Sequence, residues 1–141
     1  MKQISKSIEE TVSIAKTYAE TLHGGEVIFL QGTVGSGKTT FVRAVVEYFG
    51  ADVMVRSPSF TLMNIYPVDH KSIRRVIHLD GYRLSEAHEL DAFGLEEIVG
   101  RPDTVVMMEW PFKQHPVFTG ILFSTITFHV AGQTERIIDI V

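Results

Sequence analysis

The sequence predicts a three-layer α/β domain built on a mixed, mainly parallel β-sheet. Two short apolar runs, 27–30 and 105–108, have the composition of strands that are buried on both faces. Segments with helical periodicity alternate with such runs, and this alternation is typical of helices packed onto a sheet. Alternating apolar and polar residues at 125–130, followed by a last strand at 136–141, make the C-terminal part rich in β-structure.

The first half of the chain is expected to hold two helices that flank one strand and a glycine-rich loop. Ser7 and Glu10 have the spacing of a capping box, which predicts that a helix begins after Ser7. Apolar residues then recur at helical spacing over 8–22, and two glycines end the helix. The buried strand 27–30 and the loop come next. A second helix is expected over about 38–49, with a glycine at its end.

The second half is expected to be mainly strands. The segments 60–66 and 75–79 have strand composition, and they could pair across the polar connector 67–72. A helical stretch is expected from residue 85 to near residue 100, with a break at Gly94. The apolar run 105–108 and the two C-terminal strands then complete the sheet.

Composition limits the classes of protein that are possible. The 141 residues predict one domain, 1–141, with 45% hydrophobic and 21% charged residues, as in ordinary soluble proteins. The 13 basic and 17 acidic residues give a net charge of −4, which disfavours binding of nucleic acid by bulk charge. The absence of cysteine excludes disulfides, thiolate metal sites and cysteine nucleophiles. There is neither a bilayer-length apolar run nor a signal-peptide pattern, so a cytoplasmic protein without membrane contact is expected.

The glycine-rich segment 32–39 carries the chemistry. Its sequence, GTVGSGKT, matches the P-loop pattern G-x-x-x-x-G-K-[ST]. Glycines allow backbone angles at which successive N–H groups turn inward around phosphate oxygens, and the following helix adds its positive N-terminal dipole. Lys38 can reach the β- and γ-phosphates, and the Thr39 hydroxyl can coordinate Mg²⁺. Because the loop follows an apolar strand and precedes a helix, the sequence predicts a P-loop NTPase-like domain that binds nucleotide.

Two carboxylates are candidates for the Mg²⁺ and water chemistry that such a site needs. Asp80 and Glu109 each follow an apolar strand, and ligands of open α/β sheets bind beyond the carboxyl ends of strands. Each could instead be a solvated carboxylate that caps the next turn. The spacing does not decide which of them contacts metal and which contacts the attacking water.

Three other features of the sequence do not carry a functional prediction. The pattern D-x-x-G at 91–94 lies in a helical stretch and is interpreted as chance, and no N-K-x-D signature for guanine is present. Lys71, Arg74 and Arg75 fit a solvated hairpin tip better than an RNA contact. Trp110 fits core packing and a lid over the nucleotide equally well.

Four motifs in order resemble those of the TsaE family, the small bacterial P-loop ATPases of tRNA threonylcarbamoyladenosine biosynthesis. They are the P-loop, SPSFT at 57–61, HLDGYRL at 78–84 and EWP at 109–111. The resemblance extends over nearly the whole chain. Ser59, Gly81 and the pair 112–113 depart from the commoner residues of the family, and these departures concern the partner interface more than ATP chemistry.

The resemblance implies a role for each site residue. Thr39 and Glu109 would bind Mg²⁺, and Asp80 would lie by the γ-phosphate, as water-positioning base or further Mg²⁺ contact. The segment 57–61 would be a loop whose position depends on nucleotide state. Lys38, Asp80 and Glu109 are thus the expected catalytic residues. The expected ATP-binding residues are Thr11, Gly35, Ser36, Gly37, Lys38, Thr39, Thr40, Asp80 and Arg136, with Thr11 near the adenine.

The resemblance also implies partners. Family members act with two proteins that form a heterodimer of sugar-kinase-like folds, and contact with tRNA is expected to be indirect. Arg43 lies in the helix after the loop and should point along it, so hydrolysis is expected to be weak until a partner completes the site.

Two alternatives are a nucleotide-gated binding module without required hydrolysis and a small-molecule kinase. The kinase is disfavoured because 96–114 holds only Arg101 and Lys113, too few cations for a lid.

Overall fold

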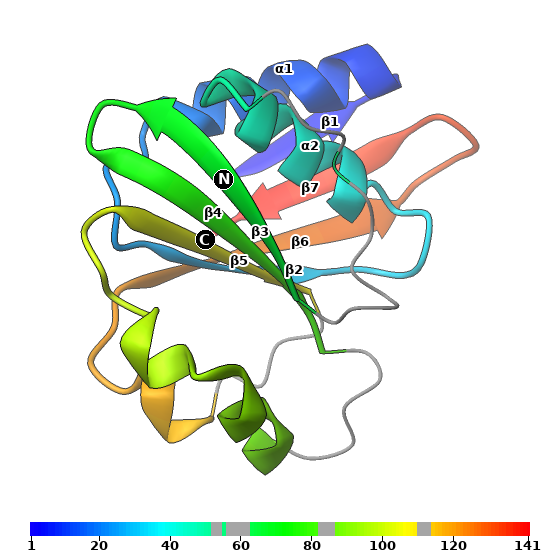
Figure 1. Cartoon of the computed structure of the whole chain (residues 1–141). Coiled ribbons are helices and arrows are strands. Elements are labelled where there is room, and N and C mark those ends of the chain that lie inside the picture. The colour runs from blue at the N-terminus through cyan, green and yellow to red at the C-terminus, as the bar shows by residue number, and fades with distance from the viewer. Residues whose placement is uncertain (52–54, 56–62, 82–86, 110–113) are drawn as a thin grey trace.

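One mixed sheet organises the chain. The computed structural model describes residues 1–51, 55, 63–81, 87–109 and 114–141. Its strands are β1 (Lys2–Ser5), β2 (Val27–Gln31), β3 (Met63–His70), β4 (Ile73–Asp80), β5 (Thr104–Glu109), β6 (Phe123–Val130) and β7 (Arg136–Ile140). Within the described residues they form one seven-stranded sheet in the order β1-β7-β6-β2-β5-β4-β3 (Figure 1).

The parallel part of the sheet is its centre. β6, β2, β5 and β4 pair in parallel, whereas β3 and β4, β6 and β7, and β7 and β1 pair in antiparallel fashion. The mixed sheet with its β-rich C-terminus is therefore confirmed, with parallel pairing limited to three of six pairings among the described strands. Short connections explain the antiparallel pairing of β3 with β4 and of β6 with β7, because parallel neighbours need a crossover of a dozen residues or more.

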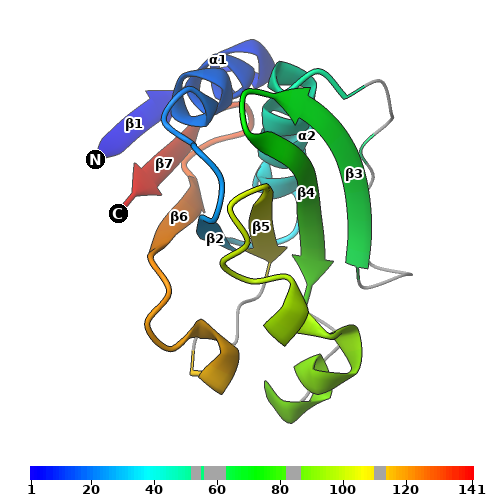
Figure 2. The ribbon, with the colours of Figure 1, turned by 60° about the vertical axis from the view of Figure 1, so that its left-hand side comes forward.

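Two α-helices among the described residues cover one face of this sheet, as both views show (Figure 1, Figure 2). They are α1 (Ile8–Ala19) and α2 (Lys38–Tyr48), close to the expected segments. The capping box forms at α1: Ser7 Oγ accepts a hydrogen bond from the Glu10 N–H at 3.1 Å. The Glu10 carboxylate reaches back to the Lys6 N–H at 2.6 Å. Local side-chain chemistry thus sets where the first helix begins.

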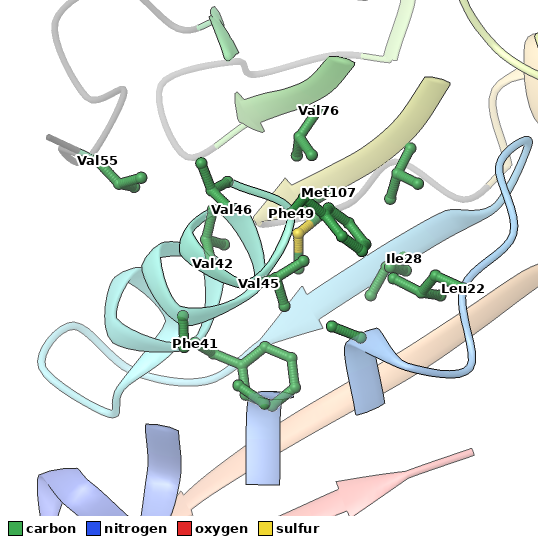
Figure 3. Close-up of a cluster of buried hydrophobic side chains, with 14 of the residues drawn as sticks. Leu22, Ile28, Phe41, Val42, Val45, Val46, Phe49, Val55, Val76 and Met107 are labelled. Atoms are coloured by element: carbon green, nitrogen blue, oxygen red, sulfur yellow. The ribbon is translucent and has the colours of Figure 1, made fainter. Parts of the chain in front are cut away.

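The main core lies between these helices and the sheet. Apolar side chains of α2 point at the strands, and those of the central strands point back (Figure 3). This cluster includes Ile28, Phe41, Phe49, Val76 and Met107, all at most 1% exposed. Its packing fixes the direction in which α2 leaves the glycine-rich loop.

The opposite face is covered by a thinner layer. It consists of the 3-10 helices η1 (Ala87–Phe93), η2 (Leu95–Glu97) and η3 (Pro116–Phe118), at the bottom of Figure 2. The helical stretch expected up to residue 100 is therefore present as short 3-10 segments, and its break is confirmed at Gly94, whose φ is +65°. The second hydrophobic cluster lies on this side and includes Phe29, Ile77, Leu95, Met108 and Phe118.

The structure contains a strand that was not expected and a connector that is shorter than expected. β1 was not predicted; it is four residues long and is held by pairing with β7 at the other end of the chain. The connector expected at 67–72 is shorter, because β3 continues through Pro67 to His70 and the turn is made near Lys71, at φ +52°. Pro67 is tolerated because β3 is an edge strand, where a missing N–H breaks no second ladder. No helix of the described residues is long and apolar enough to cross a membrane.

Candidate nucleotide-binding site

The glycine-rich loop connects the end of β2 to the start of α2. Gly35 and Gly37 have φ values of +80° and +112°, which are readily accessible only to glycine. Gly37 is the N-cap residue of α2 and has no side chain, so no side chain competes with an anion for the first N–H groups of the helix. Ser36 is fully buried, and its Oγ has no hydrogen-bond partner in the structure. The loop therefore holds an unsatisfied buried polar atom, as a phosphate cradle would.

Lys38 is held inside this loop. The side chain is nearly buried, and Nζ donates to the carbonyl oxygens of Gly32 at 2.6 Å and Thr33 at 3.0 Å. Burial lowers the pKa of the Lys38 ammonium, and the opposing charges of Glu109 and Asp80 act to raise it. The lysine and the two acidic groups are thus close enough to influence one another.

Asp80 and Glu109 are the last residues of neighbouring parallel strands. They are register partners across β4 and β5, and both are nearly buried, at 5% and 3% exposure. Glu109 is also in register with Leu30 of β2, directly before the loop. Since adjacent strands lie about 4.8 Å apart, the two residues lie side by side at the C-terminal ends of the parallel strands, the end of the sheet where the loop also begins.

The residues present fit a magnesium ion bound together with phosphates. Thr39 is half-buried in the first turn of α2, and Glu109 Oε1 is a buried oxygen without a hydrogen-bond partner. Among the described residues no group of three or more His, Asp or Glu side chains could hold a metal alone. One hydroxyl and one or two carboxylates suit Mg²⁺, which commonly takes its other ligands from substrate phosphates and water.

A cavity of about 430 Å³ opens on the other side of the loop. The start of α1, the glycine-rich loop and the segment around β7 line it. Thr11 and Arg136 both lie in its wall. The Thr11 hydroxyl shares a buried 2.7 Å hydrogen bond with Ser5 Oγ, and Arg136 Nη2 donates to the Gly35 carbonyl at 3.3 Å.

The expected site residues therefore fall into two adjoining groups. Thr11, Gly35, Ser36, Gly37, Thr40 and Arg136 line the cavity. Lys38, at the end of the loop, lies near Asp80 and Glu109, and Thr39 follows it in the first turn of α2. The segment 57–61 and Trp110 lie outside the described residues.

Sequence reasoning missed His78. It is fully buried on β4, and its Nε2 lies 3.5 Å from Glu109 Oε1. The signal was present in the sequence, because residues two apart on a strand point to the same face and His78 precedes Asp80 by two.

Arg74, Arg75 and Asp91, for which the sequence predicts no role in the site, each contact a side chain outside it. Arg74 pairs with Asp69 at 3.0 Å and Arg75 with Asp103 at 3.2 Å, near the start of β4 and away from the site. These ion pairs agree with a hairpin tip. Asp91 of the D-x-x-G pattern contacts the His115 imidazole at 2.7 Å, which joins η1 to the start of η3.

Comparisons with known proteins point to one family. The family model "Threonylcarbamoyl adenosine biosynthesis protein TsaE" matches residues 5–138. The tRNA threonylcarbamoyladenosine biosynthesis protein TsaE of Rickettsia bellii is 37% identical over 108 residues, which cover 76% of this chain and 72% of the relative. That of Aquifex aeolicus is 37% identical over 115 residues, 80% of this chain and 78% of the relative. The crystal structure of Bacillus subtilis YdiB superposes with a TM-score of 0.68 at 28% identity, over 98% of this chain and 82% of that one.

Proposed function

Because the chain belongs to the TsaE family of tRNA threonylcarbamoyladenosine biosynthesis, we propose that it is a Mg²⁺-dependent P-loop ATPase of low intrinsic activity that serves this modification. One observation carries the proposal. A buried lysine is held within a glycine-rich loop, at the end of the sheet where two neighbouring parallel strands each finish with a buried acidic residue.

The phosphates of ATP would bind to the segment 35–40. Lys38 would exchange its two carbonyl partners for phosphate oxygens, which carry full charge and hydrogen-bond more strongly. The cavity beside the loop would take the nucleoside, with Thr11 on the α1 side and Arg136 on the β7 side.

Hydrolysis would depend on the acidic pair. Thr39 and Glu109 would hold Mg²⁺, which when bound neutralises charge on the β- and γ-phosphates. Asp80, next in register, would orient the attacking water or add a further contact to the ion. Phosphoryl transfer needs positioning and charge neutralisation more than covalent chemistry, and these side chains supply both.

The positions of the arginines in the described part of the chain support the proposed weak activity. Among the described residues, Arg136 is the arginine with a hydrogen bond to the loop, and it bonds the Gly35 carbonyl on the cavity side. Arg43, on α2, donates to the Val55 carbonyl at 3.2 Å. Neither arrangement supplies an arginine beside the two carboxylates, and an arginine finger provided in trans raises rates by about 10³–10⁵.

We therefore assign completion of the site to two partner proteins, which form a heterodimer of sugar-kinase-like folds. Contact with tRNA is then indirect. The chain would act in the cytoplasm as a single domain, 1–141.

Reconstituted tRNA modification tests the proposal. Wild type, Lys38→Ala and the control Lys71→Ala, a lysine in the exposed β3–β4 turn, are each added to the two partner proteins, tRNA and ATP. We expect wild type and Lys71→Ala to support many rounds of modification, and Lys38→Ala to support none beyond the first. Sustained modification by Lys38→Ala, or by the partners alone, would contradict the proposal.

A further inference from the structure

The His78 imidazole and the Glu109 carboxylate face each other as unpaired buried groups. Neither ring nitrogen of His78 nor Glu109 Oε1 has a hydrogen-bond partner in the structure. The side chains are 0% and 4% exposed, and Nε2 lies 3.5 Å from Oε1. That separation exceeds the usual 2.7–3.2 Å of a hydrogen bond. Buried polar groups are normally paired, so two orphans at this distance need an explanation.

The strand register places His78 behind Glu109 as seen from the loop. His78 is in register with Met107, and Asp80 is in register with Glu109. His78 therefore lies two residues further than Asp80 from the C-terminal ends of the strands. His78, Asp80 and Glu109 share the face on which Val76 and Met107 pack against α2. The Glu109 oxygen that is buried and without a hydrogen-bond partner, Oε1, is also the one that lies 3.5 Å from the imidazole.

We propose that His78 is a positioning residue for Glu109: its Nε2–H donates to Oε1 and fixes the carboxylate with its other oxygen toward the phosphate loop. This inference rests on the proposed function of Glu109 as a Mg²⁺ ligand. The proposed hydrogen bond requires small rotations of the two side chains, because Nε2 and Oε1 are 3.5 Å apart. Carboxylates that ligate metals are oriented by such outer hydrogen bonds, and loss of one weakens metal affinity by about 10- to 100-fold.

Two substitutions at His78 separate hydrogen bonding from space filling. The amide nitrogen of His78→Gln reaches about as far as Nε2, whereas that of His78→Asn reaches only as far as Nδ1. His129→Asn, on an exposed part of β6, is the matched control. Binding of Mn²⁺ to the ADP-loaded protein is followed by electron paramagnetic resonance. Binding of a fluorescent ADP analogue in EDTA is measured separately.

We expect His78→Asn to weaken Mn²⁺ binding about tenfold while metal-free nucleotide affinity stays that of wild type. His78→Gln should recover most of the loss, and His129→Asn should show none. Equal losses in His78→Gln and His78→Asn, or a parallel loss of nucleotide affinity in EDTA, would show a general packing role and overturn the inference.

A double-mutant cycle with Glu109→Gln tests whether His78 acts through Glu109. If it does, adding His78→Asn to Glu109→Gln weakens Mn²⁺ binding no further, whereas independent effects would add. Should Glu109→Gln alone bind Mn²⁺ like wild type, the metal role in the proposed function fails, and this inference fails with it. Should Glu109→Gln lose affinity while His78→Asn does not, only the inference about His78 fails.

A measurement on the unmodified protein covers the case in which the His78 variants do not fold. Long-range ¹H–¹⁵N spectra distinguish the two neutral tautomers of an imidazole. We expect His78 to carry its hydrogen on Nε2. A hydrogen on Nδ1 alone would leave Nε2 with nothing to donate to Glu109 and would overturn the inference.

Discussion

Alanine at Gly32 tests whether the loop is shaped by close packing against β6. The φ of Gly32 is +153°, and a Cβ there would lie 2.6 Å from Ser36 Oγ and 2.9 Å from the Phe128 carbonyl oxygen. Phe128 is inside β6 and 3% exposed, so its backbone cannot withdraw without disturbing the sheet. The strained backbone costs about 1–3 kcal/mol. The overpacked contact costs about 1–3 kcal/mol more.

Gly35→Ala is the matched control. Its φ of +80° carries the backbone penalty of about 1–2 kcal/mol, but no atom lies within 4 Å of the added Cβ. Urea denaturation of the nucleotide-free proteins measures both losses in free energy of unfolding, with equal m-values as the check on two-state behaviour. We expect Gly32→Ala to lose clearly more than Gly35→Ala. Equal losses would refute the packing argument, because they would show that backbone conformation alone makes Gly32 necessary.

Two further predictions concern stability away from the site. Hydrogen bonds from Thr104, Arg75 and Arg101 hold the pKa of the Asp103 carboxyl below its usual range. These hydrogen bonds to the ionised carboxylate therefore stabilise the folded protein at neutral pH, and this stabilisation is lost as pH falls below about 4. Asp103→Asn should lower the urea midpoint at pH 7, and the difference in midpoint between the variant and the wild type should disappear in acid. A difference that does not change with pH would contradict this. Phe118 is 4% exposed, and its ring packs edge-on against that of Phe29 with the centroids 5.1 Å apart. Phe118→Ala should therefore lower the free energy of unfolding by about 3–5 kcal/mol in the same urea assay. A loss below about 1 kcal/mol would contradict this and would mean that η3 packs loosely.

The sequence predicts best those elements whose signals are local. The capping box at Ser7 gives the start of α1, and the glycine-rich segment with its lysine gives both the loop and the start of α2. The strands at the sheet centre follow from short apolar runs, because residues buried on both faces leave no polar alternation. These elements already place Lys38, Asp80 and Glu109 at one edge of the sheet.

Features that depend on distant partners escape such reasoning. β1 has four residues and one buried side chain, and it is a strand because β7 supplies its hydrogen bonds from the other end of the chain. The approach of His78 to Glu109 requires the register of β4 against β5. Each is a consequence of register or packing, which composition and spacing do not encode locally.

The topology also separates two tasks that the proposed function combines. The groups proposed for hydrolysis come from β4 and β5, on one side of β2, the strand that leads into the loop. The groups proposed for the nucleoside come from α1 and β7, on the other side, beyond β6. Among the described residues, Gly35, Ser36 and Gly37 of the loop line the cavity, and Lys38 at the end of the loop lies near the two carboxylates. Substitutions at Arg136 should therefore act on nucleotide affinity and those at Asp80 on hydrolysis, whereas Lys38 variants should lose both together.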